Sequence, residues 1–75
     1  MYVLRCNDET YYTGCTSDIN DRLSRHSKGQ VQYTSSRLPV NLMVIINFSD
    51  KYNAYDFERY LNSGSGKAFM NKRLI

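Results

Sequence analysis

The segment that most constrains this chain is VNLMVIINF, residues 40–48, which is apolar at nearly every position. Such a run predicts a strand covered on both faces, because a strand with one face in water would alternate apolar and polar residues. A chain of 75 residues has the length of one domain and buries only about 60% of the surface that its unfolded form exposes. The sequence therefore predicts a single α/β (α+β) domain over residues 1–75, with helices on both sides of a sheet.

Two further strands are predicted before this segment. Residues 2–6 (YVLRC) and 11–16 (YYTGCT) are rich in β-branched and aromatic residues, and the polar residues 7–10 suit a tight hairpin turn. A helix should follow, capped by Thr16, Ser17 or Asp18 and continuing to about residue 27.

The rest of the chain predicts a loop and two more helices. Gly29 should end the first helix, and residues 29–39 form a polar loop. After the apolar strand, Ser49 or Asp50 can start a helix that continues to about Leu61, and residues 65–73 suit a last short helix. The expected order of elements is ββαβαα.

The charge pattern indicates a polyanionic partner. The chain carries a net charge of +3, and all seven acids fall within residues 8–21 or 50–58, which leaves two acid-free basic segments at 22–49 and 59–75. No apolar run reaches the roughly 18–20 residues of a membrane span, and no signal peptide follows the first Met, so we expect a cytoplasmic protein. Cys6 and Cys15 fit reduced thiols, and a single histidine argues against a zinc site.

Three ionisable residues fall on the faces of the predicted helices that should turn toward the sheet. At about 100° per residue, His26 lies inside the apolar stripe of the first helix and Arg22 lies at its edge, while Glu58 lies inside the stripe of the second helix. Buried charges are costly unless they are paired or functional. Arg22 or His26 could form an internal ion pair with Glu58, the helical angles could be wrong by one residue, or the three residues could form a site.

One glycine-rich motif, at residues 63–67, is not interpreted as a phosphate-binding site. Residues 63–67 (SGSGK) resemble part of a phosphate-binding P-loop, but Leu61 occupies the position of the first glycine and Ala68 that of the required Ser or Thr. A helix break is the better interpretation.

Four stretches together resemble the GIY-YIG endonuclease superfamily, especially its small bacterial members and the nuclease domain of the excision-repair incision subunit. They are YVLRC, YYTGCTSDINDRLSRHSKG, YTSSRLPV and AYDFERYLNSGSGKAF. Tyr2 is similar to the tyrosine that closes the first family triplet, and residues 12–14 (YTG) are similar to the second. Of the first triplet only this tyrosine is present, and Cys15 stands where the excision-repair relatives carry lysine.

The resemblance implies a three-stranded antiparallel sheet flanked by helices, and hydrolysis of DNA phosphodiester bonds with one Mg²⁺ or Mn²⁺. It implies Glu58 as the metal ligand and Arg22 as the residue that stabilises charge on the phosphate. Tyr12, helped by Tyr2, would orient and deprotonate water, or His26 would serve as the base; the sequence leaves this open. A phenol, which titrates near 10, would need a lowered pKa to act as the base.

DNA is the expected substrate, RNA is not excluded, and the oligomeric state is unknown. Phosphate contacts without a recognition helix suggest structure-selective or weakly sequence-specific cleavage, in DNA repair, recombination or processing. The alternatives are a non-catalytic nucleic-acid-binding module on the same fold and a structural domain. The residues expected to contact nucleic acid are Gly14, Tyr33, Thr34, Arg37, Lys67, Asn71, Lys72 and Arg73.

Overall fold

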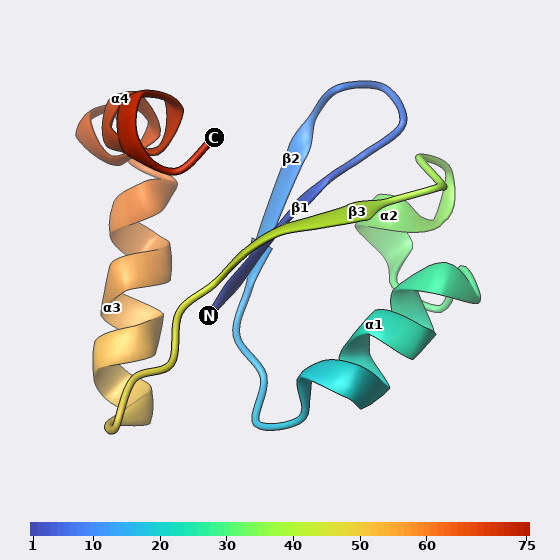
Figure 1. Cartoon of the computed structure of the whole chain (residues 1–75), viewed down its shortest axis with the longest axis horizontal. Helices are drawn as coiled ribbons and strands as arrows, with labels where there is room; N and C mark the ends of the chain where they lie inside the picture. The colour runs from blue at the N-terminus through green and yellow to red at the C-terminus, as the bar shows by residue number, and fades with distance from the viewer.

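The chain forms a three-stranded antiparallel sheet between two pairs of helices, and the computed structural model describes all of residues 1–75 (Figure 1). The elements follow in the order β1 (Tyr2–Arg5), β2 (Tyr11–Gly14), α1 (Ile19–Ser27), α2 (Gln32–Ser35), β3 (Asn41–Ile45), α3 (Lys51–Leu61) and α4 (Gly64–Arg73). The predicted α+β class and the antiparallel sheet are confirmed. The strand order is β2-β1-β3, so β1 is the central strand.

Local signals in the sequence explain where most elements begin and end. In the hairpin turn, the Asp8 carboxylate accepts hydrogen bonds from the backbone N–H of Thr10 at 3.2 Å and from its hydroxyl at 2.6 Å. The Asp18 carboxylate caps α1 by accepting from the N–H of Asp21 at 3.0 Å, and Gly29 follows the helix with a φ of 74°. The predicted helix that ends near residue 27 is therefore confirmed, and of the three candidate caps Asp18 is the one used.

The predicted break between the last two helices is confirmed: α3 ends at Leu61, Ser63 is the cap of α4, and the rest of the SGSGK stretch forms the first turn of α4. The Ser63 hydroxyl caps α4 by accepting from the N–H of Gly66 at 3.1 Å. Gly66 lies against α3, where an added Cβ would come within 1.7 Å of the Tyr60 carbonyl oxygen. The glycine therefore permits the close crossing of α3 and α4.

Two expectations for the middle of the chain are wrong. The segment predicted as a loop contains the short helix α2, which has no side-chain cap. The strand β3 is shorter than predicted and is not covered on both faces: it lies at an edge of the sheet, and Leu42, Met43 and Ile45 are exposed. The fully covered strand is β1, in which Tyr2, Val3 and Leu4 are at most 1% exposed.

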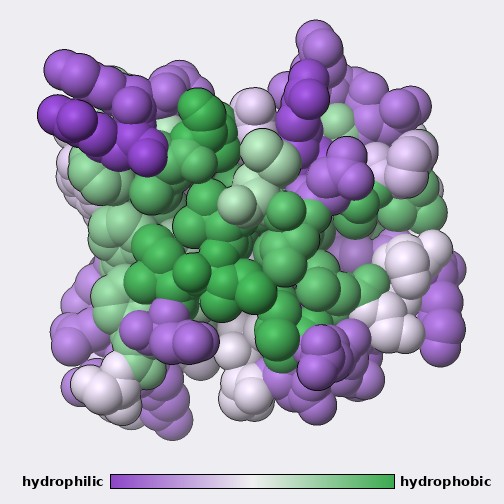
Figure 2. All heavy atoms as spheres, viewed as in Figure 1, coloured by the Kyte–Doolittle hydropathy of each residue, from purple (hydrophilic) through white to green (hydrophobic).

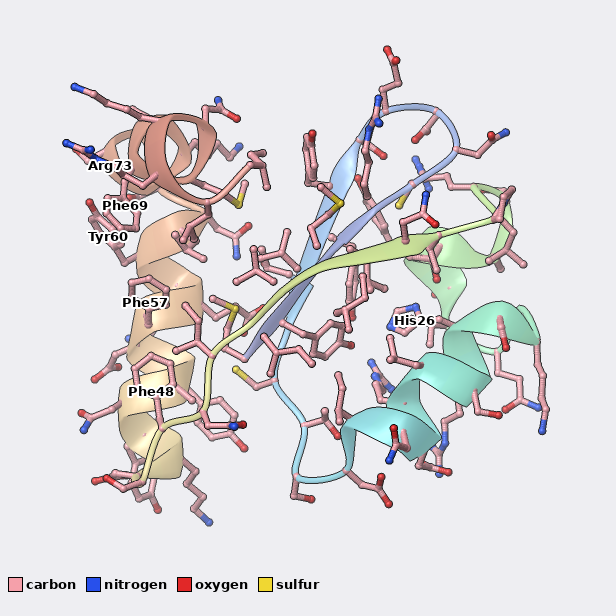
Figure 3. The ribbon with its side chains drawn as sticks, in the orientation of Figure 1. His26, Phe48, Phe57, Tyr60, Phe69 and Arg73 are labelled. Carbon is pink, nitrogen blue, oxygen red and sulfur yellow. The ribbon has the colours of Figure 1, made fainter.

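The two faces of the sheet have different interiors. Against α3 and α4 lies an apolar core built around Met1, Val3, Leu61 and Met70. A row of aromatic rings joins the segment after β3 to the two helices on this side (Figure 3); the ring centroids of Phe48 and Phe57 are 5.7 Å apart and those of Tyr60 and Phe69 are 6.1 Å apart. The face toward α1 and α2 instead buries polar side chains.

None of the helices combines the length and the apolar character that crossing a bilayer requires.

Candidate active site

A buried polar network joins β1, α1 and α2. Tyr2, His26 and Thr34 are at most 1% exposed, and every buried side-chain nitrogen and oxygen in the chain has a hydrogen-bond partner. The Nδ1 atom of His26 lies 2.7 Å from the Thr34 hydroxyl, and its Nε2 atom lies 2.9 Å from the Tyr2 hydroxyl. Both ring nitrogens of the buried histidine are therefore held in place by neutral hydroxyl groups.

The partners of these groups determine the directions of the hydrogen bonds. The Thr34 hydroxyl donates to the carbonyl oxygen of Val31 at 3.4 Å, so it accepts from the Nδ1–H of His26. The Nε2 atom is then unprotonated and accepts from the Tyr2 hydroxyl. Burial, together with the nearby charge of Arg22, lowers the pKa of His26, which favours this neutral form.

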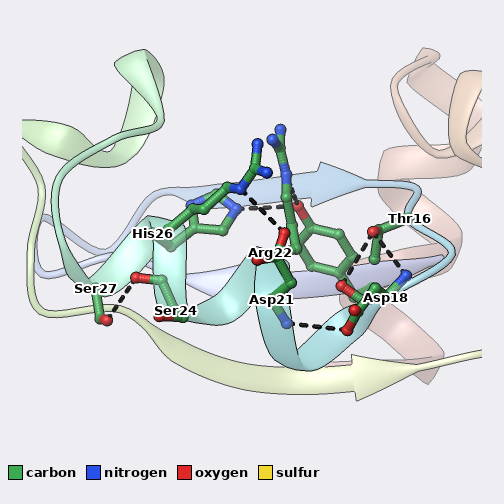
Figure 4. A network of polar contacts seen from close by, with 9 residues as sticks. Thr16, Asp18, Asp21, Arg22, Ser24, His26 and Ser27 are labelled. Carbon is green, nitrogen blue, oxygen red and sulfur yellow. Dashed lines mark hydrogen bonds and ion pairs between the residues drawn. The ribbon is translucent and has the colours of Figure 1, made fainter.

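Arg22 connects this network to a second tyrosine. Its Nε–H donates to the Tyr2 oxygen at 3.2 Å, and an Nη2–H donates to the Tyr12 oxygen at 3.3 Å. Figure 4 shows Arg22 and His26 side by side on α1, with the capping residue Asp18 at the start of the helix. Burial raises the pKa of Tyr2, and although the hydrogen bond from Arg22 opposes this shift, the phenol remains protonated at neutral pH. The Tyr2 hydroxyl therefore donates a hydrogen bond to His26.

Gly14 is the residue that leaves room for Tyr2. The two residues are directly paired across β1 and β2, and an added Cβ on Gly14 would come within 2.6 Å of the Tyr2 hydroxyl and 2.7 Å of the adjacent ring carbon. The second triplet therefore needs glycine for a close approach of the tyrosine ring to the backbone.

A cleft at the free edge of β2 joins residues from both faces of the sheet. We call it the β2 cleft; it has a volume of about 550 Å³. Side chains alternate along a strand, so Tyr12 points to the α1 side while Thr13 points to the α3 side, yet both reach the open edge and line the cleft. Its other polar lining residues include Tyr33, Glu58, Lys67 and Asn71.

Glu58 enters the β2 cleft from α3. The predicted inward orientation is correct, because the side chain is half-buried. The alternative of an internal ion pair with Arg22 or His26 is wrong: the four ion pairs in the structure involve neither Glu58 nor these two residues. The Glu58 carboxylate accepts a weak hydrogen bond from the Cys15 thiol, with Sγ 3.7 Å from Oε2. Glu58 is thus a carboxylate that faces a cleft without a cationic partner.

The residues of the cleft fit one hard divalent cation. Mg²⁺ is commonly held by one or two carboxylates together with waters and substrate phosphate oxygens, and Glu58 offers such a carboxylate beside open volume. Nowhere in the chain do three or more His, Cys, Asp or Glu side chains gather closely enough to enclose a metal by themselves. Any ion at Glu58 would therefore depend on water and on the phosphate for its remaining ligands.

Cys15 has an unreactive thiol at this position. Burial raises its pKa, and the neighbouring charge of Glu58 raises it further. The thiol therefore stays neutral beside the carboxylate.

The structure brings only some of the expected nucleic-acid contacts to the cleft. Tyr33, Lys67 and Asn71 line it. Arg37 lies in an adjoining hollow with Tyr33 and Tyr12, where its guanidinium is 4.2 Å from the Tyr33 ring centroid and its Nε is 3.0 Å from the Asp8 carboxylate.

Four of those expectations are not met at the cleft. Thr34 is buried behind His26, and Gly14 is buried under Tyr2, so neither lines the cleft. Lys72 and Arg73 are exposed on α4 but do not line the cleft, and Arg73 lies on the outer side near Phe69 (Figure 3).

Two cleft residues were missed from the sequence. Thr13 lies between the second-triplet tyrosine and glycine, and its hydroxyl accepts from the Asn62 side-chain amide at 3.2 Å. The same amide donates to the Glu58 carbonyl oxygen at 3.0 Å. Asn62 follows Glu58 by four residues, so helical spacing alone would have placed it on the same side of α3.

Comparison with known proteins bears directly on this arrangement. The model of the GIY-YIG catalytic domain matches residues 1–73. This chain belongs to the GIY-YIG family. A UPF0213 protein of Pediococcus pentosaceus is 40% identical over 80 aligned positions, which cover 100% of this chain and 83% of that protein. A UPF0213 protein of Lactococcus lactis subsp. cremoris is 45% identical over 58 residues, which cover 76% of this chain and 59% of that protein.

A UPF0213 protein of Streptococcus pneumoniae is 44% identical over 62 residues, covering 81% of this chain and 63% of that protein. The chain thus spans about 60% of the length of several relatives that it matches. No solved structure matches it.

Membership of the GIY-YIG family confirms the resemblance predicted from the tyrosines, Arg22 and Glu58, and it supports an endonuclease-type function.

Proposed function

We propose that this GIY-YIG chain is a divalent-metal-dependent endonuclease that hydrolyses phosphodiester bonds in DNA, with residues 1–75 acting as one nuclease domain. One observation carries the proposal: Tyr12, which accepts a hydrogen bond from Arg22, lines the same cleft as the unpaired carboxylate of Glu58. A cleft that only bound nucleic acid would gain nothing from this carboxylate, because it repels phosphate unless a cation lies between them.

Glu58 would hold a single Mg²⁺ or Mn²⁺. When bound, such an ion supplies positive charge that polarises the phosphate and stabilises the departing oxygen. Asn62 supports this role, because its amide bonds to the carbonyl oxygen of Glu58 and to Thr13 and so connects the end of α3 with β2.

Arg22 would stabilise the charge that develops on the phosphate. Its guanidinium is held by two tyrosine oxygens, and these hydrogen bonds raise its pKa and fix its direction before substrate arrives. Preorganised donors of this kind typically contribute about 100- to 1,000-fold in rate. Arg22 is always charged, so its contribution does not depend on pH near neutrality.

Tyr12 would contact and orient the attacking water. The water oxygen forms the new bond to phosphorus, the bond from phosphorus to the leaving ester oxygen breaks, and the proton that the water gives up is transferred through solvent to that leaving oxygen. Neutral His26 accepts a hydrogen bond from Tyr2, and the Tyr2 oxygen accepts one from Arg22, so these residues would position the guanidinium and, through it, Tyr12. Tyr2 itself is not the base, since burial raises its pKa.

The approach of DNA would follow the cleft. Lys67 and Asn71 lie on the α4 side and Tyr33 on the α2 side, so cationic and aromatic groups flank Glu58. Lysine contacts phosphate as a point charge, and none of these groups is placed on a recognition helix. We therefore propose structure-selective or weakly sequence-specific cleavage. The roles in DNA repair and the cytoplasmic location stay predictions.

The test is nicking of supercoiled, single-stranded and branched DNA with Mg²⁺, Mn²⁺ or EDTA. Glu58→Gln should abolish nicking, and Arg22→Ala should reduce it by roughly 100-fold or more. Glu9→Gln and Arg25→Ala are matched controls, since both residues form exposed ion pairs and neither lines the cleft. They should nick like the wild type.

Two outcomes would contradict the proposal. Equal nicking by Glu58→Gln would remove the metal-ligand assignment. Salt-sensitive DNA binding without nicking under any metal would instead support a binding module on the same fold.

A further inference from the structure

The strand β3 has one side that no part of the chain pairs with. It is the edge strand opposite β2, and its ladder partner is β1. None of the backbone hydrogen bonds outside the helices and the sheet involves residues 41–45. The outward N–H and C=O groups of β3 are therefore available to another strand.

The side chains of β3 are apolar and unusually exposed. Leu42, Met43 and Ile45 have exposed fractions of 40%, 44% and 46%. β3 crosses in front of the other strands in Figure 1, and the same view in Figure 2 shows a hydrophobic band across the middle of this face. Natural edge strands usually carry charged residues or proline that prevent pairing, and residues 40–48 contain neither.

The pairing of β3 with β1 is irregular near Met43. Leu4 pairs with Leu42 and Val3 with Val44, so Met43 is an extra residue between the two pairs. A bulge is one of the devices that discourage edge pairing, but here it is flanked by exposed Leu42 and half-buried Val44, which are apolar, and not by charges.

We propose that a second copy of this chain pairs with β3, edge to edge and antiparallel. Antiparallel pairing of a strand with itself obeys two-fold symmetry, so one surface is complementary to its own copy. The apolar side chains of Leu42 and Ile45 would be covered by the same residues of the other copy.

The charge distribution favours a second copy of the chain over nucleic acid as the partner of β3. The chain carries +3 overall, yet residues 38–49 include no charged residue, so two copies meet here without repulsion. The same absence of lysine and arginine leaves nothing to bind phosphate.

The dimer would have a continuous six-stranded sheet with β2 at each end. The two β2 strands would then lie roughly 24 Å apart, from five strand spacings of about 4.8 Å. Both β2 clefts stay open in this arrangement, because they lie at the edges opposite the interface. Pairing through β3 does not depend on the proposed function, since β3 lies at the edge opposite the cleft.

Sedimentation velocity of the full chain tests the proposal. The wild type should dimerise, and the double variant Leu42→Lys/Ile45→Lys should have a dimer dissociation constant raised by at least about 100-fold. Tyr55→Lys is the matched control, because Tyr55 is also 46% exposed but lies on α3. It should dimerise like the wild type. A wild type that stays monomeric at millimolar concentration, or an equal loss in the control, would overturn the proposal.

A measurement on the wild type covers the case in which the double variant does not fold. Amide hydrogen exchange at residues 41–45 should slow as the protein concentration rises, because the outward N–H groups become bonded in the dimer. Exchange that is independent of concentration at these residues would equally overturn the proposal.

Discussion

Replacing Gly14 by alanine should damage the candidate site through a single added methyl group. The new Cβ would lie 2.6 Å from the Tyr2 hydroxyl, 2.7 Å from Cζ and 3.0 Å from Cε1. Tyr2 cannot move away freely, because it is 1% exposed and its hydroxyl is bonded to His26 at 2.9 Å and to Arg22 at 3.2 Å. Either β2 separates from β1 or the ring tilts and its hydrogen bonds are lost.

The loss of stability has two contributions, the overpacking of the interior and the breaking of hydrogen bonds. Overpacking a well-packed interior costs about 1–3 kcal/mol, and each hydrogen bond that breaks costs about 1 kcal/mol. We therefore expect the free energy of unfolding to fall by about 3 kcal/mol, which a domain with a total of about 5–15 kcal/mol can survive. Nicking should fall by about 100-fold even in the folded fraction, since a displacement near 1 Å is enough for such a loss.

Urea unfolding and DNA nicking would be measured on the same preparations. Gly64→Ala is the matched control: a Cβ at Gly64 meets no atom within 4 Å, and the residue begins a helix. Its stability and nicking should equal those of the wild type. If Gly14→Ala unfolds at the wild-type urea concentration and nicks at the wild-type rate, the account of Gly14 as space for Tyr2 is refuted.

Three further predictions concern stability. The pKa of His26 is lowered in the folded protein, so the unfolded chain takes up a proton first as the pH falls below about 6.5. The free energy of unfolding should therefore drop by up to about 1.4 kcal/mol per pH unit below that value, and urea unfolding of His26→Gln at several pH values should lack this dependence on pH. Gly66→Ala would place a Cβ 1.7 Å from the Tyr60 carbonyl oxygen, so its free energy of unfolding should fall by about 3 kcal/mol and its thermal unfolding midpoint should fall with it. An unchanged midpoint would contradict the close crossing of α3 and α4. Glu9 has a φ of 66°, a conformation that suits glycine, so Glu9→Gly should stabilise the hairpin by about 0.5 kcal/mol; a lower unfolding midpoint in urea would count against this strain.

The elements predicted correctly are those with local signals. Asp18 and Asp50 accept hydrogen bonds from backbone N–H groups two or three residues later, and Gly29 has the positive φ that ends a helix. Such contacts are the same in any fold, so the sequence reports them directly. The helix α2 has no side-chain cap and spans four residues, and for that reason its sequence did not distinguish it from a loop.

The covering of β3 could not be predicted from its composition. A continuous apolar run is typical of a strand between two layers of helices, but it also describes an edge strand whose apolar side chains remain exposed. Which of these holds depends on strand order, and β1 takes the central position because it pairs with both β2 and β3.

The candidate site, too, could be predicted only in part from the sequence. Helical spacing predicted that Arg22, His26 and Glu58 turn inward, and the family resemblance added the tyrosines. Neither source could show that Arg22 bonds to Tyr2 and Tyr12, because that contact depends on the hairpin register, in which Tyr2 lies opposite Gly14.

The sequence by itself determined the ends of the three longer helices, the hairpin, the inward ionisable residues and the family, since each depends on neighbouring residues or on a motif. Only the tertiary structure decided that YYTG forms the open edge of the sheet. At this edge Tyr12, supported by Arg22 from one face, lines a cleft with Glu58 from the other. The reason is physical: side chains on opposite faces of a sheet can share a cleft only around a free edge, and strand pairing over long separations creates that edge.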